Sequence, residues 1–502
     1  MSFENELDSI PTSNSAYCFV SNSQVHCIPI DALNAFSDIY FDNTNLLSDV
    51  SDFTPNKLYL SNKNLLYSLN NPSISDVEDS NNGNDDEFLI SSSPSHEEFL
   101  KNLNNFITYS IYLPKFIVNL LENLSNDFSE LRTLLCKIFN WTSPSKINLN
   151  QLTGGITNML LSIQYESQNY LVRIYGHGTN LIIDRHREFI SHLILNSLNL
   201  APPIYARFKN GVIYGFLPGK SLKPQQLKNP NIYPLVAQLL GTWHSSIDSK
   251  LIENGVEKLR DYTLSIKKKK FNKKLIKNLN KKKFINNFWE LIEQWINIVP
   301  INSNLIESFN NHLTNIDVNE NTLKQVILDE FAWLKLTLEN VNSPTVSCHC
   351  DLLSGNVIIP DDYDLDKPLI NLPKAEDNPI KFIDYEYMLP GPRAFDIANH
   401  FAEWQGFDCD RSAIPEPTSN NPIFIKFVKG YLNNNDADPI EINQLINEII
   451  MFYGLPGFYW GIWAMIQSEI SNIDFDYFTY GSKRLEEYWD WKKNYLKNSK
   501  GD

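Results

Sequence analysis

Residues 349–356 read His-Cys-Asp-Leu-Leu-Ser-Gly-Asn, and a second short segment, residues 382–384, reads Phe-Ile-Asp. Each polar residue in this spacing has a chemical use. The carboxylate of Asp351 can accept the proton of an attacking hydroxyl group and orient that group towards a phosphate. The amide oxygen of Asn356 and the carboxylate of Asp384 are hard oxygen ligands of the kind that Mg²⁺ prefers. Together the two segments predict magnesium-assisted phosphoryl transfer.

The order of these residues, H-x-D-x4-N and then two hydrophobic residues and Asp, is the layout of the catalytic and metal-binding loops in kinase-like folds. We assign His349 to bracing the loop rather than to the chemistry. The alternative, that these polar residues only form turns, is weak because strand-like sequence precedes both segments. A protein kinase or an antibiotic kinase would share the same core, but no A-P-E triplet of an activation segment follows Asp384.

A glycine pair upstream offers a loop for phosphate. Residues 153–158 read Thr-Gly-Gly-Ile-Thr-Asn, and the pair precedes two predicted strands. Glycines allow the backbone to approach phosphate oxygens, and the threonine and asparagine can donate hydrogen bonds. Any hairpin turn can contain a glycine pair, but the Walker sequence G-x4-G-K-[ST] is absent, which excludes a P-loop. The residues predicted to contact ATP here are Gly154, Gly155, Thr157 and Asn158.

Arg173 stands where a protein kinase has its strand lysine. Arginine can bind phosphate in a bidentate manner and keeps its charge. Glu188 follows at the start of a predicted helix, where it can pair with Arg173. Its alternative role is to interact favourably with the helix macrodipole. We predict the ion pair and assign both residues to the ATP site.

Aromatic and acidic residues are dense in the C-terminal half, in residues 385–404 and 458–481. Trp460 and Trp463 are three residues apart and so share one face of a helix. Aromatic faces and a carboxylate together can bind an ammonium group. Helical spacing alone favours the other interpretation, that the tryptophans belong to the hydrophobic core. We assign Asp396 to a structural hydrogen bond with the H-x-D loop.

Several longer segments resemble the choline/ethanolamine kinase family, and the ethanolamine kinases most. The similar sequences are TGGITNML, LVRIYGHGTNLIIDRHRE, HCDLLSGNVI, KFIDYEY, RAFDIANHFAEW and FYWGIWAMIQSEISNIDFDYFTYG, in this order between residues 106 and 491. The resemblance implies an α+β, protein-kinase-like two-lobed fold, with a small β-rich N-lobe and a large, mainly helical C-lobe. It implies phosphorylation of an amino alcohol with ATP and Mg²⁺ in the cytoplasm, the first step of the CDP-ethanolamine route to phosphatidylethanolamine.

The resemblance also implies roles for individual residues. Asp351 would be the catalytic base, and Asn356 and Asp384 would bind the metal. Arg173 and the 154–158 loop would hold the phosphates. The ammonium pocket would be formed by Tyr387, Glu403, Trp460, Trp463 and Tyr480. The resemblance therefore favours assigning Trp460 and Trp463 to the site and not to the core.

Leu353 bears on the choice of acceptor. Choline kinases usually have Gln two residues after the catalytic aspartate, whereas Leu353 resembles the ethanolamine branch. A primary ammonium group needs hydrogen-bond acceptors and a trimethylammonium group needs only an aromatic cage, and this chain offers both. We expect an ethanolamine kinase and keep a choline kinase, or an enzyme that uses both acceptors, as the alternative.

The composition of the 502-residue chain excludes several classes of protein. Hydrophobic residues make up 42%, enough for a large core, and the net charge of −16 argues against a general nucleic-acid binder. The longest strongly apolar run, residues 455–466, is too short for a bilayer span. Six cysteines without paired spacing indicate a reduced, intracellular protein and not a zinc site at Cys348 and Cys350.

We expect three regions: an N-terminal extension, the N-lobe and the C-lobe, at residues 1–105, 106–219 and 220–497. Within the N-lobe, apolar spacing predicts helices at 116–124, 130–139 and 188–198, and hairpins at 158–176 and 205–219.

The extension has a strand-like segment at 17–30 and an acidic stretch at 68–95 that we expect to be disordered. Strand-like sequence at 356–360 and 380–387 interrupts the C-lobe, whose lysine-rich stretch at 267–283 we interpret as a solvated helix or loop. A non-catalytic scaffold that binds partners through its acidic extension is an alternative, which the intact catalytic and metal-binding residues disfavour. We expect ATP and a small amino alcohol as partners, and neither nucleic acid nor a transmembrane segment; a homodimer stays an open alternative.

Overall fold

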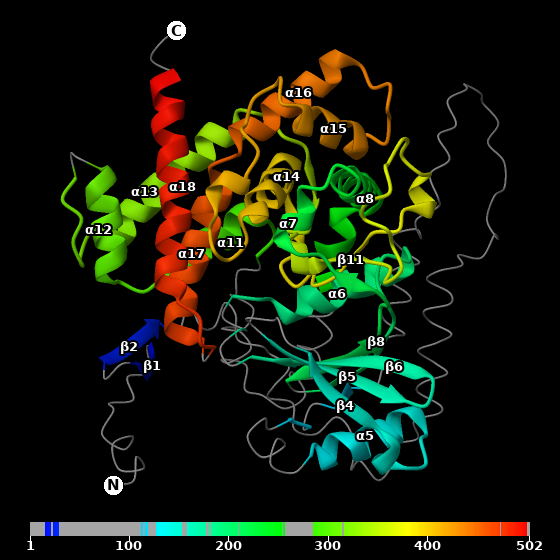
Figure 1. Cartoon of the computed structure of the whole chain (residues 1–502). Coiled ribbons are helices and arrows are strands. Elements are labelled where there is room, and N and C mark those ends of the chain that lie inside the picture. Colours follow the sequence, from blue (N-terminus) through cyan, green and yellow to red (C-terminus); the bar gives the residue numbers. More distant parts are fainter. Residues whose placement is uncertain are drawn as a thin grey trace, which may run out of the picture.

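The protein is described by a computed structural model. The described residues are 16–21, 24–29, 112–113, 116–118, 127–152, 158–176, 179, 182–208, 210–253, 255–256, 285–313, 316–471 and 473–498. The predictions for the stretches 68–95 and 267–283, and for Gly154, Gly155 and Thr157, lie outside them. Figure 1 shows two parts, a twisted sheet with few helices and, above it, a larger assembly of helices.

The smaller part is a six-stranded sheet in the order β3-β7-β8-β6-β5-β4. Only β3 and β7 pair in parallel; the other neighbours are antiparallel. The strands are β3 Tyr112–Leu113, β4 Asn148–Leu152, β5 Asn158–Tyr165, β6 Gln168–Tyr175, β7 Ile204–Phe208 and β8 Gly211–Gly215. The predicted hairpins at 158–176 and 205–219 are therefore confirmed.

A helix lies against each face of this sheet, α5 (Ser129–Phe139) on one and α6 (Arg185–Ser197) on the other. Successive residues of a strand point to opposite faces. Ile213 accordingly belongs to the hydrophobic cluster that contains α5, and the preceding Val212 to the cluster that contains α6 and the helical part. The helix predicted at 188–198 begins earlier, at Arg185. Apolar spacing did not reveal this start, because polar residues form the first turn.

The helix predicted at 130–139 is confirmed as α5, whereas the prediction at 116–124 is wrong for its described residues. Phe116–Val118 is not helical. The backbone N–H of Val118 donates to Asn210 Oδ1, and its carbonyl accepts from Asn210 Nδ2, both at 3.0 Å. The tip of the β7–β8 hairpin thus takes both backbone groups of Val118 that a helix would use.

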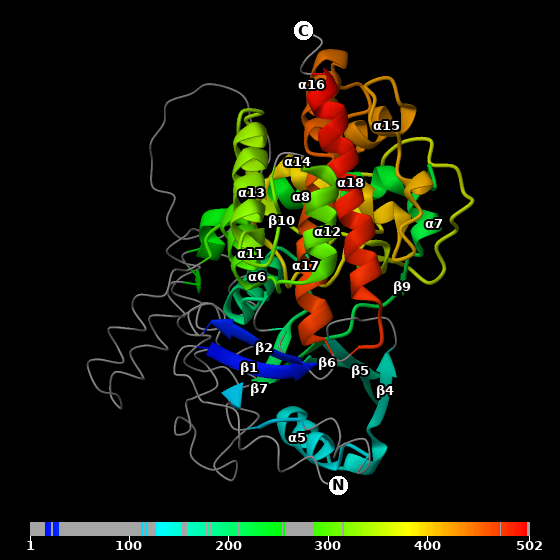
Figure 2. The same ribbon diagram turned by 90° about the vertical axis from the view of Figure 1, so that its left-hand side faces the viewer.

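The larger part is mainly helical. Its helices are α7 Pro224–Leu227, α8 Tyr233–Ser246, α11 Phe288–Ile298, α12 Ser303–His312, α13 Leu323–Glu339, α14 Arg393–Ala402, α15 Pro422–Tyr431, α16 Pro439–Met451, α17 Leu455–Ile470 and α18 Tyr477–Asn498, with 3₁₀ turns that include η7 Ser354–Asn356 and η9 Glu403–Gln405. Figure 2 shows α17 and α18 side by side. Gly457 allows their close approach because it has no side chain: a Cβ atom there would lie 2.5 Å from the carbonyl oxygen of Arg484.

Two small sheets lie within the helical part. The first has the order β12-β11-β9, and the second pairs β10 with β13. Their strands are β9 Lys220–Ser221, β10 Thr345–Cys348, β11 Val357–Ile359, β12 Lys381–Phe382 and β13 Leu389–Pro392. The strand-like stretches at 356–360 and 380–387 are confirmed as β11 and β12. Since these strands pair antiparallel, residues 361–378 extend the connection of a hairpin.

The N-terminal strand-like segment is confirmed as the hairpin β1 (Ala16–Ser21) and β2 (Gln24–Pro29). Pro439–Ile470, which contains α16 and α17, is the described stretch that is long and apolar enough to cross a membrane by length and composition. Of its most apolar window, 83% is buried inside the protein, as in the core helices of globular proteins.

Candidate active site

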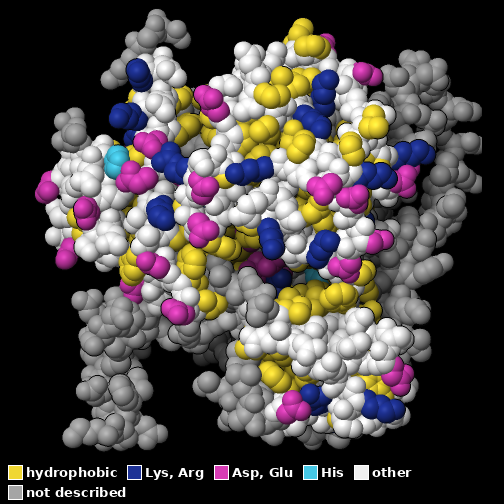
Figure 3. All heavy atoms as spheres, viewed as in Figure 1, with side chains coloured by type: hydrophobic (Ala, Val, Ile, Leu, Met, Phe, Trp, Pro, Cys, Tyr) yellow, Lys and Arg dark blue, Asp and Glu magenta, His cyan; other side chains and the backbone are white. Residues whose placement is uncertain are grey.

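A cavity of about 400 Å³ lies between the sheet and the helical part. In Figure 3, charged side chains of both signs are visible in the furrow between the two parts. All the predicted site residues that the structure describes line this cavity: Asn158, Arg173, Glu188, Asp351, Asn356, Asp384, Tyr387, Glu403, Trp460, Trp463 and Tyr480. The sequence prediction therefore selected residues that share one space, although they span more than 300 positions of the chain. Leu353, used to choose the acceptor, also lines it.

Asp351 lies in the loop between β10 and η7. Asn356 Nδ2 donates to the backbone oxygen of Asp351 at 2.7 Å and to its Oδ2 at 3.2 Å. The other oxygen, Oδ1, is buried and has no hydrogen-bond partner among the described residues. Burial, followed by the charges of Asp384 and Glu403, raises the pKa of Asp351 well above its usual value. An unsatisfied buried carboxylate oxygen beside a second carboxylate is an arrangement that a cation would stabilise.

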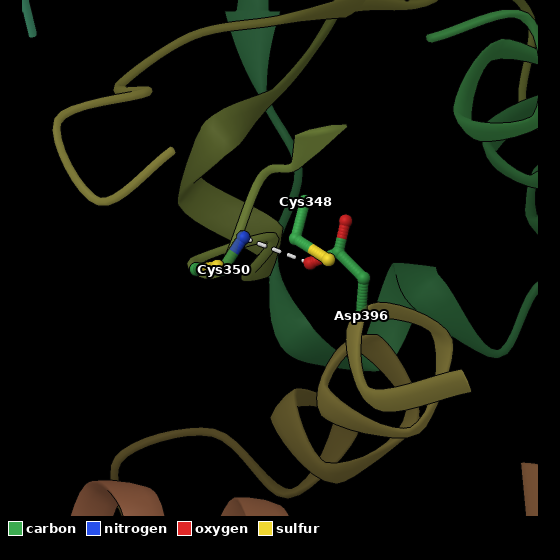
Figure 4. Close-up of side chains that lie close together, drawn as sticks. All are labelled: Cys348, Cys350 and Asp396. Atoms are coloured by element: carbon green, nitrogen blue, oxygen red, sulfur yellow. Dashed lines mark hydrogen bonds between the residues drawn. The ribbon is translucent and has the colours of Figure 1, made fainter. Parts of the chain in front are cut away.

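Asp396 holds the backbone of this loop, which confirms its predicted structural role. Its Oδ2 accepts from the backbone N–H of His349 at 2.7 Å. Its Oδ1 accepts from the backbone N–H of Cys350 at 2.8 Å, the bond drawn in Figure 4. His244 Nε2 lies 2.9 Å from Oδ2. Burial raises the pKa of Asp396, but the hydrogen bond and charge of His244 outweigh it, so the pKa lies below the usual value. The loop is thereby anchored to the start of α14.

His349 connects the two predicted loops. Its Nε2 lies 3.1 Å from the backbone oxygen of Ile383, the residue before Asp384. Burial lowers the pKa of His349 to about 4, so the ring is neutral at neutral pH. Asp384 has a φ angle of 62°, in the left-handed region that few residues other than glycine adopt. The neutral ring of His349 thus supports the backbone next to Asp384, a strained residue and a predicted metal ligand. This contact agrees with the bracing role predicted for His349.

One face of α14 and the η9 turn after it joins this loop to the rest of the cavity. Asp396, Asn399, His400 and Glu403 recur at intervals of three and four residues, which places them on the same face. Asn399 Nδ2 donates to the backbone oxygen of Cys350 at 3.0 Å, and its Oδ1 accepts from Trp460 Nε1 at 2.7 Å. His400 Nδ1 lies 2.9 Å from the backbone oxygen of Leu352. A single helical face thus contacts the H-x-D loop at four backbone groups and ends at Glu403.

Arg173 lies at the centre of a buried cluster of carboxylates. Its Nη1 is 3.3 Å from Glu188 Oε1, which confirms the predicted ion pair. The same nitrogen is 2.7 Å from Asp384 Oδ1 and 3.4 Å from Glu386 Oε2. Burial raises the pKa of Asp384 to about 6, while the charge of Arg173 acts to lower it. Arg173, on β6, therefore bridges the sheet to the loop that carries Asp384.

Arg185 and Glu386 are two further charged residues of this cluster, and neither had a predicted role. Arg185 Nη1 lies 2.8 Å from both Glu188 Oε2 and Glu386 Oε2, and its Nη2 donates to Asn158 Oδ1 at 3.2 Å. Burial raises the pKa of Glu386, but Arg185 and Arg173 lower it further, so it lies below the usual value. The quoted segments LIIDRHRE and KFIDYEY contain these two residues. The available signal was their position, Arg185 three residues before Glu188 and Glu386 two residues after Asp384.

Three aromatic residues form one wall of the cavity. Trp463 Nε1 donates to the hydroxyl oxygen of Tyr387 at 2.8 Å. The rings of Trp460 and Trp463 are 5.2 Å apart and nearly perpendicular, and Tyr387 meets Trp460 edge to face at 6.0 Å. Both tryptophans are at least 96% buried and still line the cavity. The two interpretations of this pair, core and site, are therefore compatible.

Glu403 and Tyr480 complete this end of the cavity, and Arg484, which the sequence analysis missed, lies behind them. Arg484 Nη1 is 2.9 Å from Glu403 Oε1 and donates to the hydroxyl oxygen of Tyr480 at 3.1 Å. Arg484 and Tyr480 are four residues apart on α18, so their side chains share a face. The carboxylate that was predicted to bind an ammonium group is thus already paired with a buried guanidinium group.

The sulfur atoms of Cys348 and Cys350 and a carboxylate oxygen of Asp396 lie within 4.8 Å of one another. Figure 4 shows the three side chains together. Burial raises the pKa of both thiols, and a thiolate is the form that binds metals. Both carboxylate oxygens of Asp396 already accept hydrogen bonds. The cluster therefore supports the loop through Asp396, and that these cysteines are not a zinc site stays a prediction.

The chain is similar in sequence and in fold to known proteins. The sequence model of the family described as choline/ethanolamine kinase matches residues 149–489. The chain is 29% identical to a probable ethanolamine kinase of Nematostella vectensis, over 73% of this chain and 94% of the relative. It is 30% identical to probable ethanolamine kinase A of Dictyostelium discoideum, over 72% of this chain and 92% of the relative. The structure is similar to that of a Plasmodium vivax ethanolamine kinase, with a TM-score of 0.55, 28% identity, and coverage of 80% of this chain and 95% of the other. Residues 149–489 include every residue that lines the cavity.

Proposed function

Because the chain belongs to the choline/ethanolamine kinase family, we propose that it transfers the γ-phosphoryl group of ATP to the hydroxyl group of ethanolamine. The observation that carries the proposal is the shared cavity, which is lined by Asp351, by the Arg173–Asp384 cluster and by the aromatic wall. The fold is the predicted protein-kinase-like, two-lobed α+β fold. We assign residues 106–219 to the N-lobe and 220–497 to the C-lobe, with 1–105 as an extension.

In this proposal Asp351 is the catalytic base. Its carboxylate accepts the proton of the substrate hydroxyl group and orients the oxygen in line with the γ-phosphate. Asn356 fixes the rotamer of Asp351 through its amide nitrogen, which directs Asn356 Oδ1 away from Asp351. No described residue hydrogen-bonds to that oxygen. Neutralisation of Asp384 by a cation would remove the largest charge that raises the pKa of Asp351.

The donor set fits Mg²⁺, which in this family of reactions neutralises the charge on the phosphates. Asn356 and Asp384 would hold it, because both present hard oxygen atoms to the cavity next to an unsatisfied oxygen of Asp351. Arg173 and Asn158 would contact ATP together with Gly154, Gly155 and Thr157, and Glu188 would hold Arg173 in place. Phosphate can replace the carboxylates around Arg173 because guanidinium groups bind both in the same planar geometry.

The aromatic end of the cavity would take the amino alcohol. Tyr387, Trp460 and Trp463 offer ring faces and edges, and Glu403 and Tyr480 offer oxygen atoms. A primary ammonium group can donate to those oxygens as well as lie against the rings. Leu353, in place of the glutamine usual in choline kinases, supports ethanolamine as the preferred acceptor.

The decisive experiment measures Mg²⁺-dependent ADP release from ATP with ethanolamine, with choline and with no acceptor, at matched concentrations. We expect ethanolamine to stimulate release most. We expect Asp351→Asn to lower kcat at least about a hundredfold, as loss of a general base does. Asp361→Asn, the same change at an exposed position of the 361–378 connection, is the matched control and should retain full activity.

A preference for choline in this assay would support the alternative acceptor, and equal use of both would support a dual enzyme. If neither acceptor stimulated release, or if Asp351→Asn retained near wild-type turnover, the proposal would be wrong. By its reaction the enzyme would act in the cytoplasm, on the CDP-ethanolamine route to phosphatidylethanolamine. A homodimer is a further proposal, which the molecular mass in solution would test.

A further inference from the structure

Arg484 is the fully buried cation behind the aromatic end of the cavity, with a side chain that is 0% exposed. Its guanidinium group hydrogen-bonds to one acid and forms an ion pair, without a hydrogen bond, with a second. Nη1 lies 2.9 Å from Glu403 Oε1, and Nε lies 3.2 Å from Glu487 Oε1. Glu403 lines the cavity, whereas Arg484 and Glu487 are not among its lining residues. Glu403, Arg484 and Glu487 are called the acid–arginine triad below.

The triad determines how Glu403 is presented. A buried carboxylate without a partner tends to become protonated, and a guanidinium ion beside it stabilises the charged form. Arg484 engages Oε1 of Glu403, and no described residue hydrogen-bonds to Oε2. Oε2 is also not fully buried, so it is accessible from open space. Since Glu403 lines the cavity, that space is where the substrate would lie.

The triad also determines the local charge. Two carboxylates and one guanidinium ion sum to one negative charge, which one ammonium group neutralises. The other charged or titratable groups near the triad are Asp351 on the H-x-D loop, Cys409 and Arg411 after η9, and Tyr480 and Lys483 on α18. Asp351 is the acid among these that also lines the cavity, and the proposed reaction uses it at the hydroxyl end of the substrate.

We propose that Arg484 is a positioning residue for the amino alcohol: it holds one oxygen of Glu403 and leaves the other directed at the ammonium group, and Glu487 behind it sets the net charge of the pocket. This inference rests on the proposed function and goes beyond it by naming residues that do not touch the substrate. Because Arg484 partly neutralises Glu403, the pocket favours a ligand that donates N–H hydrogen bonds over one that offers only charge. Ethanolamine is of the first kind, and choline is of the second.

Glu487→Gln is the sharper test, because it removes one charge and keeps the shape of the side chain. We expect KM for ethanolamine to rise about tenfold, which corresponds to one such electrostatic interaction in a partly buried site. kcat and KM for ATP should stay within about twofold, because uniform binding of the acceptor alone is lost. Glu486→Gln is the matched control, since the neighbouring Glu486 side chain is 51% exposed, and it should leave all three constants unchanged.

A pH profile distinguishes this role from a purely structural one. Burial raises the pKa of Glu487 above its usual value. As the pH falls through that pKa, Glu487 takes up a proton and the triad becomes neutral. KM of the wild-type enzyme for ethanolamine should therefore rise towards acidic pH, whereas KM of Glu487→Gln should start high and lack this rise.

Arg484→Met and Arg484→Lys test the other half of the proposal. We expect Arg484→Met to raise KM for ethanolamine, because Glu403 loses the guanidinium group that holds its Oε1. Arg484→Lys should recover part of the binding, because it restores a cation. If Arg484→Met does not fold, Glu487→Gln decides the question.

An unchanged KM for ethanolamine in Glu487→Gln, or a folded Arg484→Lys that is no better than Arg484→Met, would overturn the inference while wild-type activity with ethanolamine stands. Absence of ethanolamine-dependent activity in the wild type would instead overturn the proposed function. The two failures are therefore distinguishable.

Discussion

Asp396 is a single side chain on which the position of the catalytic loop depends. It is fully buried and accepts from two backbone N–H groups and contacts His244. Replacement by alanine would leave these three groups without an acceptor. We expect Asp396→Ala to lower the free energy of unfolding by about 3–5 kcal/mol, as does removal of one partner of a buried ion pair. Urea denaturation measures the change.

The matched control is Asp490→Ala, which removes an aspartate that is 53% exposed and pairs with Arg411 at the surface. It should change the free energy of unfolding by at most about 1 kcal/mol. The pKa of Asp396 is lower in the folded protein than in the unfolded chain, so its contribution is present at neutral pH. That contribution is lost as the pH falls from about 4 towards the folded pKa, and the difference between wild type and Asp396→Ala should shrink there. An equal loss of stability in both variants, at all pH values, would contradict the role given to Asp396.

At the scale of residues, the sequence predicted the site residues that lie at a fixed spacing along the chain. Asp351, Asn356 and Asp384 were identified because their order along the chain follows from the loops that carry them. Arg185 and Arg484 were not, because their partners Glu386 and Glu403 are 201 and 81 positions away. A buried ion pair between distant elements leaves no periodic signal in the sequence.

At the scale of elements, the contact between α17 and α18 holds the acceptor end of the cavity together. A Cβ atom on Gly457 would lie 2.5 Å from the backbone oxygen of Arg484 and 2.9 Å from the backbone nitrogen of Tyr488. Backbone atoms of a packed helix cannot move aside as a flexible side chain can. We expect Gly457→Ala to destabilise the protein by about 1–3 kcal/mol, as overpacking does, and to raise KM for ethanolamine because α18 carries Tyr480.

Thermal unfolding and steady-state kinetics check this expectation. Ser468→Ala, at a half-buried position later on the same helix, is the control and should be close to neutral. A gain in stability for Gly457→Ala, from the higher helix propensity of alanine, would show that the two helices can separate without loss.

Elements with a clear hydrophobic period were predictable, and β13 was not. The β5–β6 hairpin and α5 were identified because strands of eight residues and a helix of eleven residues are long enough to show their periods. β10 was indicated by strand-like sequence before His349, whereas β13 is the sequence Leu-Pro-Gly-Pro, which reads as a turn. Phe116–Val118 was mispredicted because its backbone partner, Asn210, lies 92 positions from Val118.

At the scale of the whole molecule, every described residue of the cavity lies between positions 152 and 480. β1 and β2 pair with each other and with no other described strand. We therefore expect a protein that begins at residue 106, which keeps β3 in the sheet, to retain kcat/KM for ethanolamine within about threefold of the full chain. The comparison uses both proteins purified in the same way and assayed for ADP release.

A loss of more than tenfold in the shortened protein, with its melting temperature unchanged, would show that the extension takes part in catalysis or its control. The two-lobed architecture was predictable because strand-rich sequence precedes helix-rich sequence. The closure of the cavity was not, since it depends on Arg173 and Arg185 reaching Asp384 and Glu386 across the two parts.

The helical face from Asp396 to Glu403 has a consequence for how this chain can change length during evolution. Each residue of a helix turns the chain by about 100°, so one inserted residue between those positions would rotate Glu403 away from the acceptor while Asp396 kept the catalytic loop. Residues 361–378, which link two hairpin strands, carry no such constraint. In a library of random single-residue insertions, active variants should often carry the insertion in that connection and never in α14. Changes of chain length should therefore accumulate in that connection and not in α14.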